Sequence, residues 1–299
     1  MNKTPSVTIG IPVYNGAATI QATALSVLGQ TYRDLELLIV DNASTDSTQS
    51  VCEALADGDS RVRYVRNATN IGQKANFTKV FQEATGTYFR WMVDDDWLEP
   101  SYVEECVAAL EATPGASLVS TYQAHVKPDG EELYFEYTGR RPISDDPIVR
   151  LQILLNLLTG SALWIDPIYC LIRRSHIPGP APIRRIRFGD ETLACELALA
   201  GSFVHIPRKL AFRSWAPLPK GRKATAQYTG TSASGIRSWT KAASQRLIMM
   251  RIVAGKVITQ PGLSNTQRTR GLAVIGAFGV KKATIRVWRY VAKRIPGRS

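Results

Sequence analysis

The sequence predicts an α/β fold with a mainly parallel sheet that is covered by helices on both faces. Apolar runs that suit buried strands alternate with segments of helical period through about the first 100 residues. Such an order is typical of parallel strands joined by crossover helices. With 299 residues the chain is long enough for one large α/β domain. Its 44% hydrophobic content is that of a folded protein and excludes wholesale disorder.

Each element of the first part has a plausible start or end. The expected strands are residues 6–14, 35–42, 62–67 and 88–93, and the expected helices between them are residues 17–30, 44–56 and 72–85. Ser44 or Asp46 is the candidate N-cap of the second helix, because a side-chain oxygen there can accept a free backbone N–H. Gly86 is expected to end the third helix, since glycine favours helix C-termini.

The rest of the chain continues the same domain and then changes character. Its expected elements are helices at 101–113, 145–160 and 190–200, and strands at 116–126, 131–137 and 168–174. Residues 216–235 are rich in Pro, Gly, Ser and Thr and are expected to form a flexible loop. Two basic helical segments are expected at about 236–258 and 264–295.

Charge is distributed unevenly along the chain. The net charge is +12, yet residues 201–299 carry 20 Lys or Arg and no Asp or Glu. The first 200 residues therefore have 17 basic against 25 acidic residues, a net charge of −8. This asymmetry predicts a basic appendage that meets an anionic surface, either a membrane leaflet or a nucleic acid.

Cysteines and apolar segments exclude several classes of protein. The four cysteines include no C-x-x-C pair, so neither a zinc site nor a disulfide framework is expected, and the thiols are expected to be reduced. The N-terminus lacks the apolar core of a signal peptide. The apolar stretch 271–280 has ten residues, against about 20 for a membrane-spanning helix. We expect a cytoplasmic protein with no spanning helix.

Three adjacent carboxylates follow the apolar strand in "WMVDDDWLEP", at Asp94, Asp95 and Asp96. Carboxylates this close repel, so one must stay protonated or a cation must compensate them. Mg²⁺ and Mn²⁺ prefer oxygen ligands, and Mg²⁺ commonly combines one or two carboxylates with substrate phosphates. Ligands of open parallel sheets collect at this edge, where the strands end. The alternative is an acidic turn in which Asp96 caps the next helix.

Four segments resemble the family 2 glycosyltransferases, which have the GT-A fold, use nucleotide sugars and invert the anomeric centre. They are "VTIGIPVYNG" at 7–16, "LELLIVDNASTDST" at 35–48, "NIGQKANF" at 70–77 and the acidic segment at 91–100. The resemblance covers about the first 100 residues, in the family's order and spacing. One departure is Val93, which stands where the family often has the first Asp of a D-x-D-D pattern.

The resemblance assigns the donor site to the first half of the chain. The donor-binding residues that it implies are Pro12, Val13, Tyr14, Asn15, Asp41, Asn70, Lys74 and Asp94, and the metal-binding residues for Mn²⁺ or Mg²⁺ are Asp95 and Asp96. Tyr14 can lie against a planar base. Asp41 would accept a hydrogen bond from the base, or alternatively stabilise the turn that follows it. Lys74 would face the diphosphate, or alternatively be a solvated helix residue.

The resemblance places the general base in "FGDETLACELAL" at 188–199, with Asp190 as the base and Glu191 as its rival. Inverting transfer to a hydroxyl needs such a base opposite the departing diphosphate. The alternative is that Asp190 only caps the helix. The implied catalytic domain is 1–215, with a nucleotide-binding half at 1–100 and an acceptor half at 101–215, followed by the loop 216–235 and the basic segment 236–299.

The expected activity is transfer of a sugar from a nucleoside-diphosphate sugar to a glycan or lipid-linked acceptor, in the synthesis of a cell-surface polysaccharide or glycolipid. We expect the basic segment to hold the enzyme peripherally at the anionic inner face of the cell membrane. The alternative, which is compatible with the first, is that its helices pack on the catalytic domain and its charges are solvated. A nucleotidyltransferase is an alternative, although the glycine-rich phosphate loop is missing because Gly16 stands alone in its loop. A nucleic-acid-binding protein is a second alternative, but the acidic first part would repel a polyanion, so we expect no nucleic-acid partner.

Overall fold

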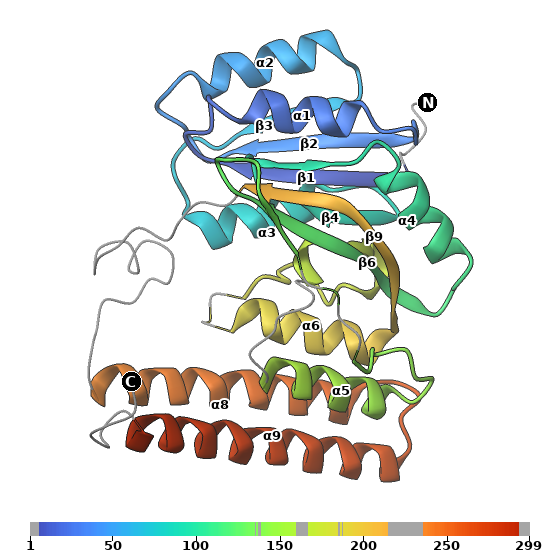
Figure 1. The fold of residues 1–299 in the computed structure, drawn as a ribbon, viewed down its shortest axis with the longest axis vertical. Helices are drawn as coiled ribbons and strands as arrows, with labels where there is room; N and C mark the ends of the chain where they lie inside the picture. Colours follow the sequence, from blue (N-terminus) through green and yellow to red (C-terminus); the bar gives the residue numbers. More distant parts are fainter. Residues whose placement is uncertain are drawn as a thin grey trace.

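The computed structural model describes residues 6–134, 136, 139–159, 167–184, 186, 188–214 and 236–292, and the side chains within them except those of 236–243 and 285–292 (Figure 1). The loop expected at 216–235 lies outside the described residues. In the described part all the strands belong to one sheet.

The first part of the chain confirms the predicted alternation of strands and helices. The strands are β1 (Val7–Val13), β2 (Leu35–Asp41), β3 (Val62–Arg66) and β4 (Tyr88–Trp91), and the helices between them are α1 (Ile20–Leu28), α2 (Thr48–Gly58) and α3 (Gln73–Glu83). β1 pairs in parallel with β2 and β4, and β2 pairs in parallel with β3. The carboxyl ends of these strands therefore share one edge of the sheet.

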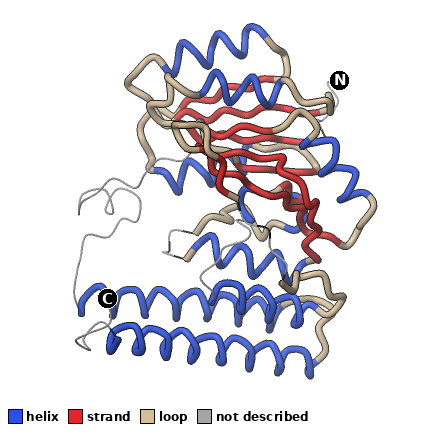
Figure 2. Tube along the Cα trace, in the orientation of Figure 1, coloured by secondary structure: helices blue, strands red, loops and turns tan. Residues whose placement is uncertain are grey.

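The two faces of the sheet bury different side chains because successive residues of a strand point to opposite sides. In β2, Leu37 and Ile39 join the core beneath α1 and α2, whereas Leu38 and Val40 join the core that contains α3. Figures 1 and 2 show α1 and α2 above the sheet and α3 on its other side. Both faces are thus covered, as the continuous apolar runs predicted.

The second part of the chain adds mixed pairing to the sheet. It contributes β5 (Asp96–Leu98), α4 (Tyr102–Glu111), β6 (Ala116–Val126), β7 (Glu132–Leu133), β8 (Leu171–Arg173) and β9 (Ser202–Ser214). β8 is antiparallel to β4 and β6, β5 is antiparallel to β9, and β6 is parallel to β9. The prediction of β6 is confirmed, but no strand was predicted for β9, whose pairing with β6 contains register shifts. The strand order across the sheet is β3-β2-β1-β4-β8-β6-β9-β5, with β7 paired to β6.

Several predicted boundaries were wrong. The N-cap of α2 is Ser47 rather than Ser44 or Asp46, and α3 ends at Glu83, three residues before Gly86. Asp96 does not cap the next helix: it begins β5, where it pairs with Arg213 of β9, and the N-cap of α4 is Ser101. Cross-strand pairing to a distant segment decided that position, which no local pattern shows.

Four helices form a layer at the end of the molecule away from α1 and α2 (Figure 1). They are α5 (Pro147–Thr159), α6 (Gly189–Ala200), α8 (Ile236–Thr259) and α9 (Asn265–Ala292). α5 contacts α6 and α9, and α8 contacts α6 and α9. Their common core includes Leu151, Leu154, Leu193, Leu197, Met249, Val253, Ile275 and Phe278. The described part of the basic segment therefore packs on the rest of the fold.

Close approach within this layer depends on a glycine. A Cβ at Gly271 would lie 2.7 Å from a methyl of Val257 and 3.0 Å from Ile148, so a larger residue would push α9 away from α8 and α5. None of the helices in the described residues is both long enough and apolar enough to cross a bilayer.

Candidate active site

The candidate site lies at the carboxyl edge of the parallel strands, where the loops after β1, β2, β3 and β4 meet. Backbone hydrogen bonds join these loops to the strands: Asn42 N–H donates to the Val13 carbonyl at 2.9 Å, and Met92 N–H donates to the Gly10 carbonyl at 3.0 Å. The edge therefore brings together the loops that begin at Tyr14, Asn42 and Asp94.

The loop after β1 presents an aromatic ring to solvent. Pro12 and Val13 are buried in the strand end, whereas the Tyr14 side chain is 48% exposed. Asn15 has a φ of 56°, a left-handed conformation that asparagine tolerates better than most residues. Its Oδ1 accepts the Thr45 N–H at 2.8 Å. Of the four residues expected at the base and ribose, Tyr14 and Asn15 are exposed to solvent.

The loop after β2 holds this first loop by side-chain acceptors. Ser44 Oγ accepts the Asn15 N–H at 2.9 Å, and Thr48 Oγ1 accepts the Gly16 N–H at 2.9 Å. Asp46 also serves its own helix, because its carboxylate accepts the Thr48 N–H at 3.0 Å. The polar residues of "DNASTDST" thus fix the backbone of the neighbouring loop.

Asp41 is fully buried and is engaged on both carboxylate oxygens. Oδ1 accepts the Ser44 N–H at 2.9 Å and the Ser44 hydroxyl at 2.5 Å. Oδ2 accepts the Tyr64 hydroxyl at 2.9 Å and lies 3.6 Å from Arg66 Nε. Asp41 therefore stabilises the turn that follows it, which was one of its two predicted roles. Contact with a base stays a prediction.

A network of asparagines, which the sequence analysis missed, connects the loops. Asn42 donates to Asn70 Oδ1 at 2.9 Å and accepts from Asn67 at 3.1 Å. Asn67 also donates to Asn76 Oδ1 at 2.9 Å and accepts from Lys79 at 2.7 Å. Asn70 thus helps to position the third loop while staying exposed. The recurrence of Asn after successive strands was the available signal.

Asp94 lies against the loop after β1. Its Oδ2 accepts from Thr19 Oγ1 at 3.3 Å, and its carbonyl accepts from Thr23 Oγ1 at 2.8 Å. A Cβ at Gly16 would lie 2.2 Å from Asp94 Oδ2, so the glycine leaves room for this carboxylate. Burial raises the pKa of Asp94, and the charge of Asp95 raises it further. The carboxylate is therefore placed at the expected donor side.

The Asp96 side chain lies against the end of β9, and not against the loop after β1 that Asp94 contacts. Its Oδ1 lies 3.6 Å from Arg213 Nε, and its side chain is 2% exposed. Oδ2 is buried and has no hydrogen-bond partner among the described residues. Burial raises the pKa of Asp96 to about 7, although the charges of Arg213 and Arg90 lower it. The fold thus supplies part of the positive charge that the acidic turn needs.

Three successive residues at the end of β9 contact the acidic turn at 94–96 and the residue that follows it. Beside the ion pair of Asp96 with Arg213, Trp97 stacks on Phe212 with ring centroids 5.5 Å apart. The Ser214 hydroxyl donates to the Asp95 carbonyl at 2.8 Å. Arg213 and Phe212 were not predicted as site residues. They lie 115 or more residues from their partners Asp96 and Trp97, and no local sequence pattern indicates a pairing over that separation.

The remaining carboxylates fit a hard divalent cation. Neither Asp94 nor Asp95 forms an ion pair within the part of the chain that is described, and both are partly exposed. No three His, Cys, Asp or Glu side chains of the described residues converge as a complete metal site. One or two carboxylates suffice when substrate phosphates supply further oxygen ligands. The donor set thus suits Mg²⁺ or Mn²⁺ bound together with a diphosphate.

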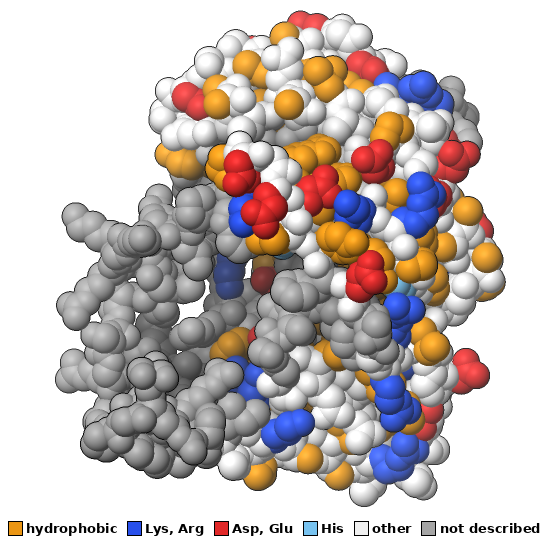
Figure 3. Space-filling model, in the orientation of Figure 1, with side chains coloured by type: hydrophobic (Ala, Val, Ile, Leu, Met, Phe, Trp, Pro, Cys, Tyr) orange, Lys and Arg blue, Asp and Glu red, His pale blue; other side chains and the backbone are white. Residues whose placement is uncertain are grey.

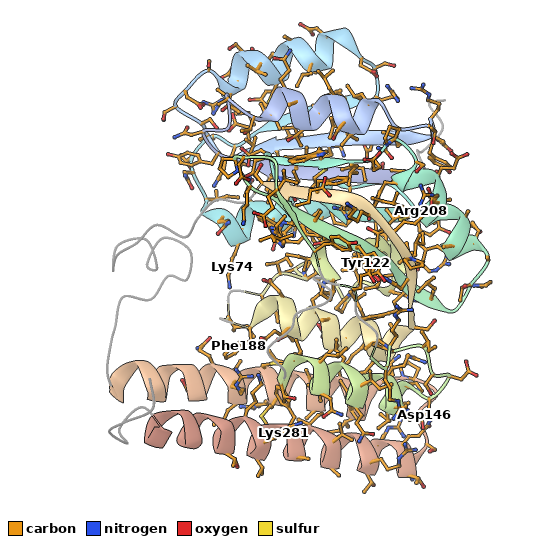
Figure 4. The ribbon with its side chains drawn as sticks, in the orientation of Figure 1. Lys74, Tyr122, Asp146, Phe188, Arg208 and Lys281 are labelled. Carbon is orange, nitrogen blue, oxygen red and sulfur yellow. The ribbon has the colours of Figure 1, made fainter. Side chains whose placement is uncertain are left out.

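The expected base, Asp190, lies in the first turn of α6 with Glu191 beside it. The Asp190 side chain reaches solvent, yet the surrounding protein desolvates it and raises its pKa, while the Lys74 charge acts in the opposite direction. Lys74 Nζ donates to the Ile186 carbonyl at 2.6 Å. Figure 4 shows Lys74 directed from α3 toward the segment before α6. Lys74 therefore joins the donor half to the element that carries Asp190.

Buried contacts fix the start of α6. Arg184 and Glu196 form a two-point ion pair with N–O distances of 2.5 and 2.7 Å, and Glu196 is 3% exposed. A Cβ at Gly189 would lie 2.6 Å from the Arg184 carbonyl, so glycine permits the close turn before the helix. Asp190 is not an N-cap here: the cap is Phe188, and the helix begins at Gly189.

Comparison with known proteins agrees with this architecture. A hyaluronan synthase of Pasteurella multocida is 36% identical over 130 residues, which are 44% of this chain and 13% of the synthase. The chain therefore spans a small part of that relative's length. The crystal structure of S. aureus TarS 1-349 in complex with UDP-GlcNAc superposes with a TM-score of 0.63 at 14% identity, covering 90% of this chain and 71% of that chain.

The mannosyltransferase PcManGT from Pyrobaculum calidifontis, in complex with GDP-Man and Mn²⁺, has a TM-score of 0.51 at 16% identity, covering 96% of this chain and 88% of that chain. At such identities the likeness shows the fold, which is GT-A. The model of glycosyl transferase family 2 matches residues 8–175, more than half of the chain. These residues include every loop of the donor side, and the chain therefore belongs to glycosyl transferase family 2 and is a glycosyltransferase.

Proposed function

We propose that this glycosyltransferase moves a sugar from a nucleoside-diphosphate sugar to a hydroxyl of a glycan or lipid-linked acceptor, with inversion. One observation carries the proposal: Asp94 lies against the loop after β1, with Asp95 beside it and no Lys or Arg pairing either carboxylate in the described structure. That arrangement suits a cation and a diphosphate. TarS and PcManGT, which share the fold, were solved with UDP-GlcNAc and with GDP-Man and Mn²⁺.

The donor half holds the nucleotide. Tyr14 lies beside the base, since its ring is exposed at the strand end. Pro12, Val13 and Asn15 form the backbone wall, and Asp41 keeps this wall in place through Ser44. Asn70 and Lys74 line the side near α3, where Lys74 adds positive charge for the diphosphate. Asp41→Asn tests whether the base also contacts that carboxylate.

Asp94 and Asp95 would hold Mn²⁺ or Mg²⁺, which when bound neutralises the charge that grows on the leaving diphosphate. Asp96, the second metal ligand expected from the sequence, is committed to Arg213 in this structure. We assign it to holding the acidic turn on β9.

Asp190 is the general base. It takes the proton of the acceptor hydroxyl as the hydroxyl oxygen bonds to the anomeric carbon. The bond from that carbon to the diphosphate oxygen breaks, and the nucleoside diphosphate departs with the electron pair. The raised pKa of Asp190 suits this role, because a base whose pKa lies closer to neutrality accepts a proton more readily.

We place the enzyme at the anionic inner face of the cell membrane, in the synthesis of a surface polysaccharide or glycolipid. Residues 201–299 carry 20 Lys or Arg and no acidic residue, and each basic residue near an anionic leaflet contributes about 1 kcal/mol. The hyaluronan synthase among the relatives is named for a polysaccharide.

A thermal-shift screen of nucleoside diphosphates and their sugars, with and without Mn²⁺, tests the donor. Only ligands with higher affinity for the folded state raise the melting temperature. We expect one nucleotide series to stabilise the protein, and to do so more strongly with the metal. Turnover should release nucleoside diphosphate. Release of pyrophosphate would instead establish the nucleotidyltransferase, and no nucleotide effect at all would refute the donor site.

A further inference from the structure

The outer face of α8 and α9 exposes large apolar side chains. Five of the ten large hydrophobic residues that are exposed in the described structure lie on these two helices. On α8 they are Leu247, Ile248 and Ile258, exposed by 64%, 39% and 53%, and on α9 they are Leu272 and Val280, exposed by 40% and 69%. Monomeric proteins rarely gather such residues on one surface without a function.

Helical spacing places most of these residues opposite the buried stripe of their helix, whereas Leu272 lies about a quarter turn from the stripe of α9. On α8 the buried positions are Met249, Val253 and Val257, four residues apart, so Leu247, Arg251 and Ile258 fall on the other side. On α9 the buried positions are Gly271, Ile275 and Phe278. Since α5 and α6 cover the buried stripes, the opposite sides of α8 and α9 face away from the sheet. We call this surface the outer face; Lys281 lies at its edge, about a quarter turn from the buried stripe of α9.

Charge on this surface is entirely positive. Residues 244–284 contain seven Lys or Arg and no Asp or Glu. Several of them serve the fold: Arg270 pairs with Asp146 at 2.9 Å, Arg246 lies over the Phe188 ring, and Lys282 donates to the Leu158 carbonyl. Arg251 and Lys281 are exposed and form no ion pair within the described residues. In Figure 3 the described lower part of the molecule shows several Lys and Arg side chains among hydrophobic ones and few acidic side chains.

The combination of exposed apolar side chains and positive charge on α8 and α9 indicates which partner binds there. A second copy of the chain would bring the same positive charge against itself, with no carboxylate on either face to compensate it. An anionic lipid leaflet supplies both complements: lipid phosphates for Arg251 and Lys281, and an apolar interior for the aliphatic side chains. Peripheral helices that bind membranes share this pattern of apolar residues flanked by basic ones.

We propose that the outer face of α8 and α9 lies in the interface of an anionic membrane, with Leu247, Ile258 and Val280 inserted among the lipids. The inference deepens the proposed membrane location and rests on it, because it assigns binding to a defined surface and makes it partly apolar. Binding therefore has one component that salt screens and one that salt leaves intact.

The orientation suits an acceptor that reaches the enzyme from the lipid. In Figure 1 the carboxyl ends of β1 and β9, the first turn of α6 and the start of α8 all lie on the left side of the view, while α9 lies at the bottom. The catalytic edge and the membrane-facing surface are thus adjacent sides of the molecule. A lipid-linked hydroxyl would approach Asp190 without the enzyme leaving the membrane.

Flotation of the full chain with vesicles tests this surface. We compare neutral phosphatidylcholine vesicles with vesicles that also contain phosphatidylglycerol, at low and high salt. The triple variant Leu247→Ser, Ile258→Ser, Val280→Ser should weaken binding to anionic vesicles by at least about tenfold at both salt concentrations. The double variant Arg251→Gln, Lys281→Gln should weaken binding mainly at low salt.

Matched controls use exposed apolar residues elsewhere, Leu25→Ser and Ile143→Ser, which are 56% and 64% exposed. They should bind vesicles like the wild type. Equal loss in the controls, unchanged binding of the triple variant, or a dimer that the triple variant dissociates in sedimentation would overturn the proposal. The thermal shift caused by nucleotide sugars is measured in parallel. If they do not raise the melting temperature of the wild type, the proposed donor is refuted, while the vesicle result still tests the membrane surface.

Discussion

The proposed donor side and the proposed acceptor side of the site are built in different ways. The donor side consists of loops that follow successive parallel strands, and its polar residues bond mainly to one another, as in the network of Asn42, Asn67 and Asn70. The acceptor side is assembled from distant segments, with Asp190 on α6 and Arg213 at the end of β9. Lys74 and Asp96 reach across from the first half to these segments.

The difference separates binding from catalysis. A change on the acceptor side can remove the proton acceptor while the loops that hold the nucleotide keep their own hydrogen bonds. A change at the acidic turn affects both sides, because β9 supports the turn from the acceptor half. Substitutions at Asp190, at Asp95 and at the pair of Asp96 with Arg213 therefore test how independent the two sides are.

Asp190→Asn is expected to have the largest effect. Loss of a general base lowers the rate by roughly 100- to 10,000-fold. Donor affinity should stay close to the wild-type value, because the donor residues lie in the other half. Steady-state transfer and donor titration calorimetry measure the two quantities. The matched control is Glu191→Gln. If that variant loses the activity and Asp190→Asn retains it, Glu191 is the base.

Asp95→Asn should abolish the metal-dependent part of donor binding. A metal that stabilises the diphosphate contributes several kcal/mol, which corresponds to about 100-fold or more in affinity. Titration of nucleotide with Mn²⁺ and with a chelator measures the difference. Asp96→Asn is the control, because that carboxylate pairs with Arg213. Loss of metal dependence in Asp96→Asn, but not in Asp95→Asn, would restore Asp96 as the metal ligand.

Arg213→Gln should lower the thermal stability by leaving the buried Asp96 without its cation. Adding Asp96→Asn should recover part of the loss, since neighbouring charges couple by roughly 0.5–3 kcal/mol. The free energies of unfolding of the wild type, the two single variants and the double variant complete this double-mutant cycle. Strict additivity of the two effects would mean that the contact does not support the acidic turn.

The smallest expected effect is that of Lys74→Met on the pH dependence of transfer. Because burial raises the pKa of Asp190, the acid limb of the rate profile should lie above the ordinary range of an aspartate, with activity falling as pH drops through that pKa. Lys74→Met removes a charge that lowers this pKa, so the limb should move to higher pH.

The control for that shift is Lys127→Met. Lys127 pairs with Glu131 in the turn between β6 and β7, away from the charges that act on Asp190. A profile that is the same in the wild type and in Lys74→Met would separate Lys74 from Asp190.

The sequence by itself determined the parallel half of the sheet. β1, β2, β3 and β4 were predicted within one or two residues, and so were the loops that carry Tyr14, Asp41 and Asp94. Their apolar runs are local and continuous, because strands buried on both faces tolerate few polar residues. The basic helices were also predicted, since α8 and α9 keep a regular helical period.

Only the tertiary structure decided how the acidic charge is compensated and what the basic helices contact. Asp96 meets Arg213 through the pairing of β5 with β9, and register between strands so far apart in the chain depends on the whole sheet. The buried stripe of α8 faces α6, which leaves Leu247 and Ile258 outside. Local periodicity gives the elements, whereas contacts between distant elements give each charged side chain its partner.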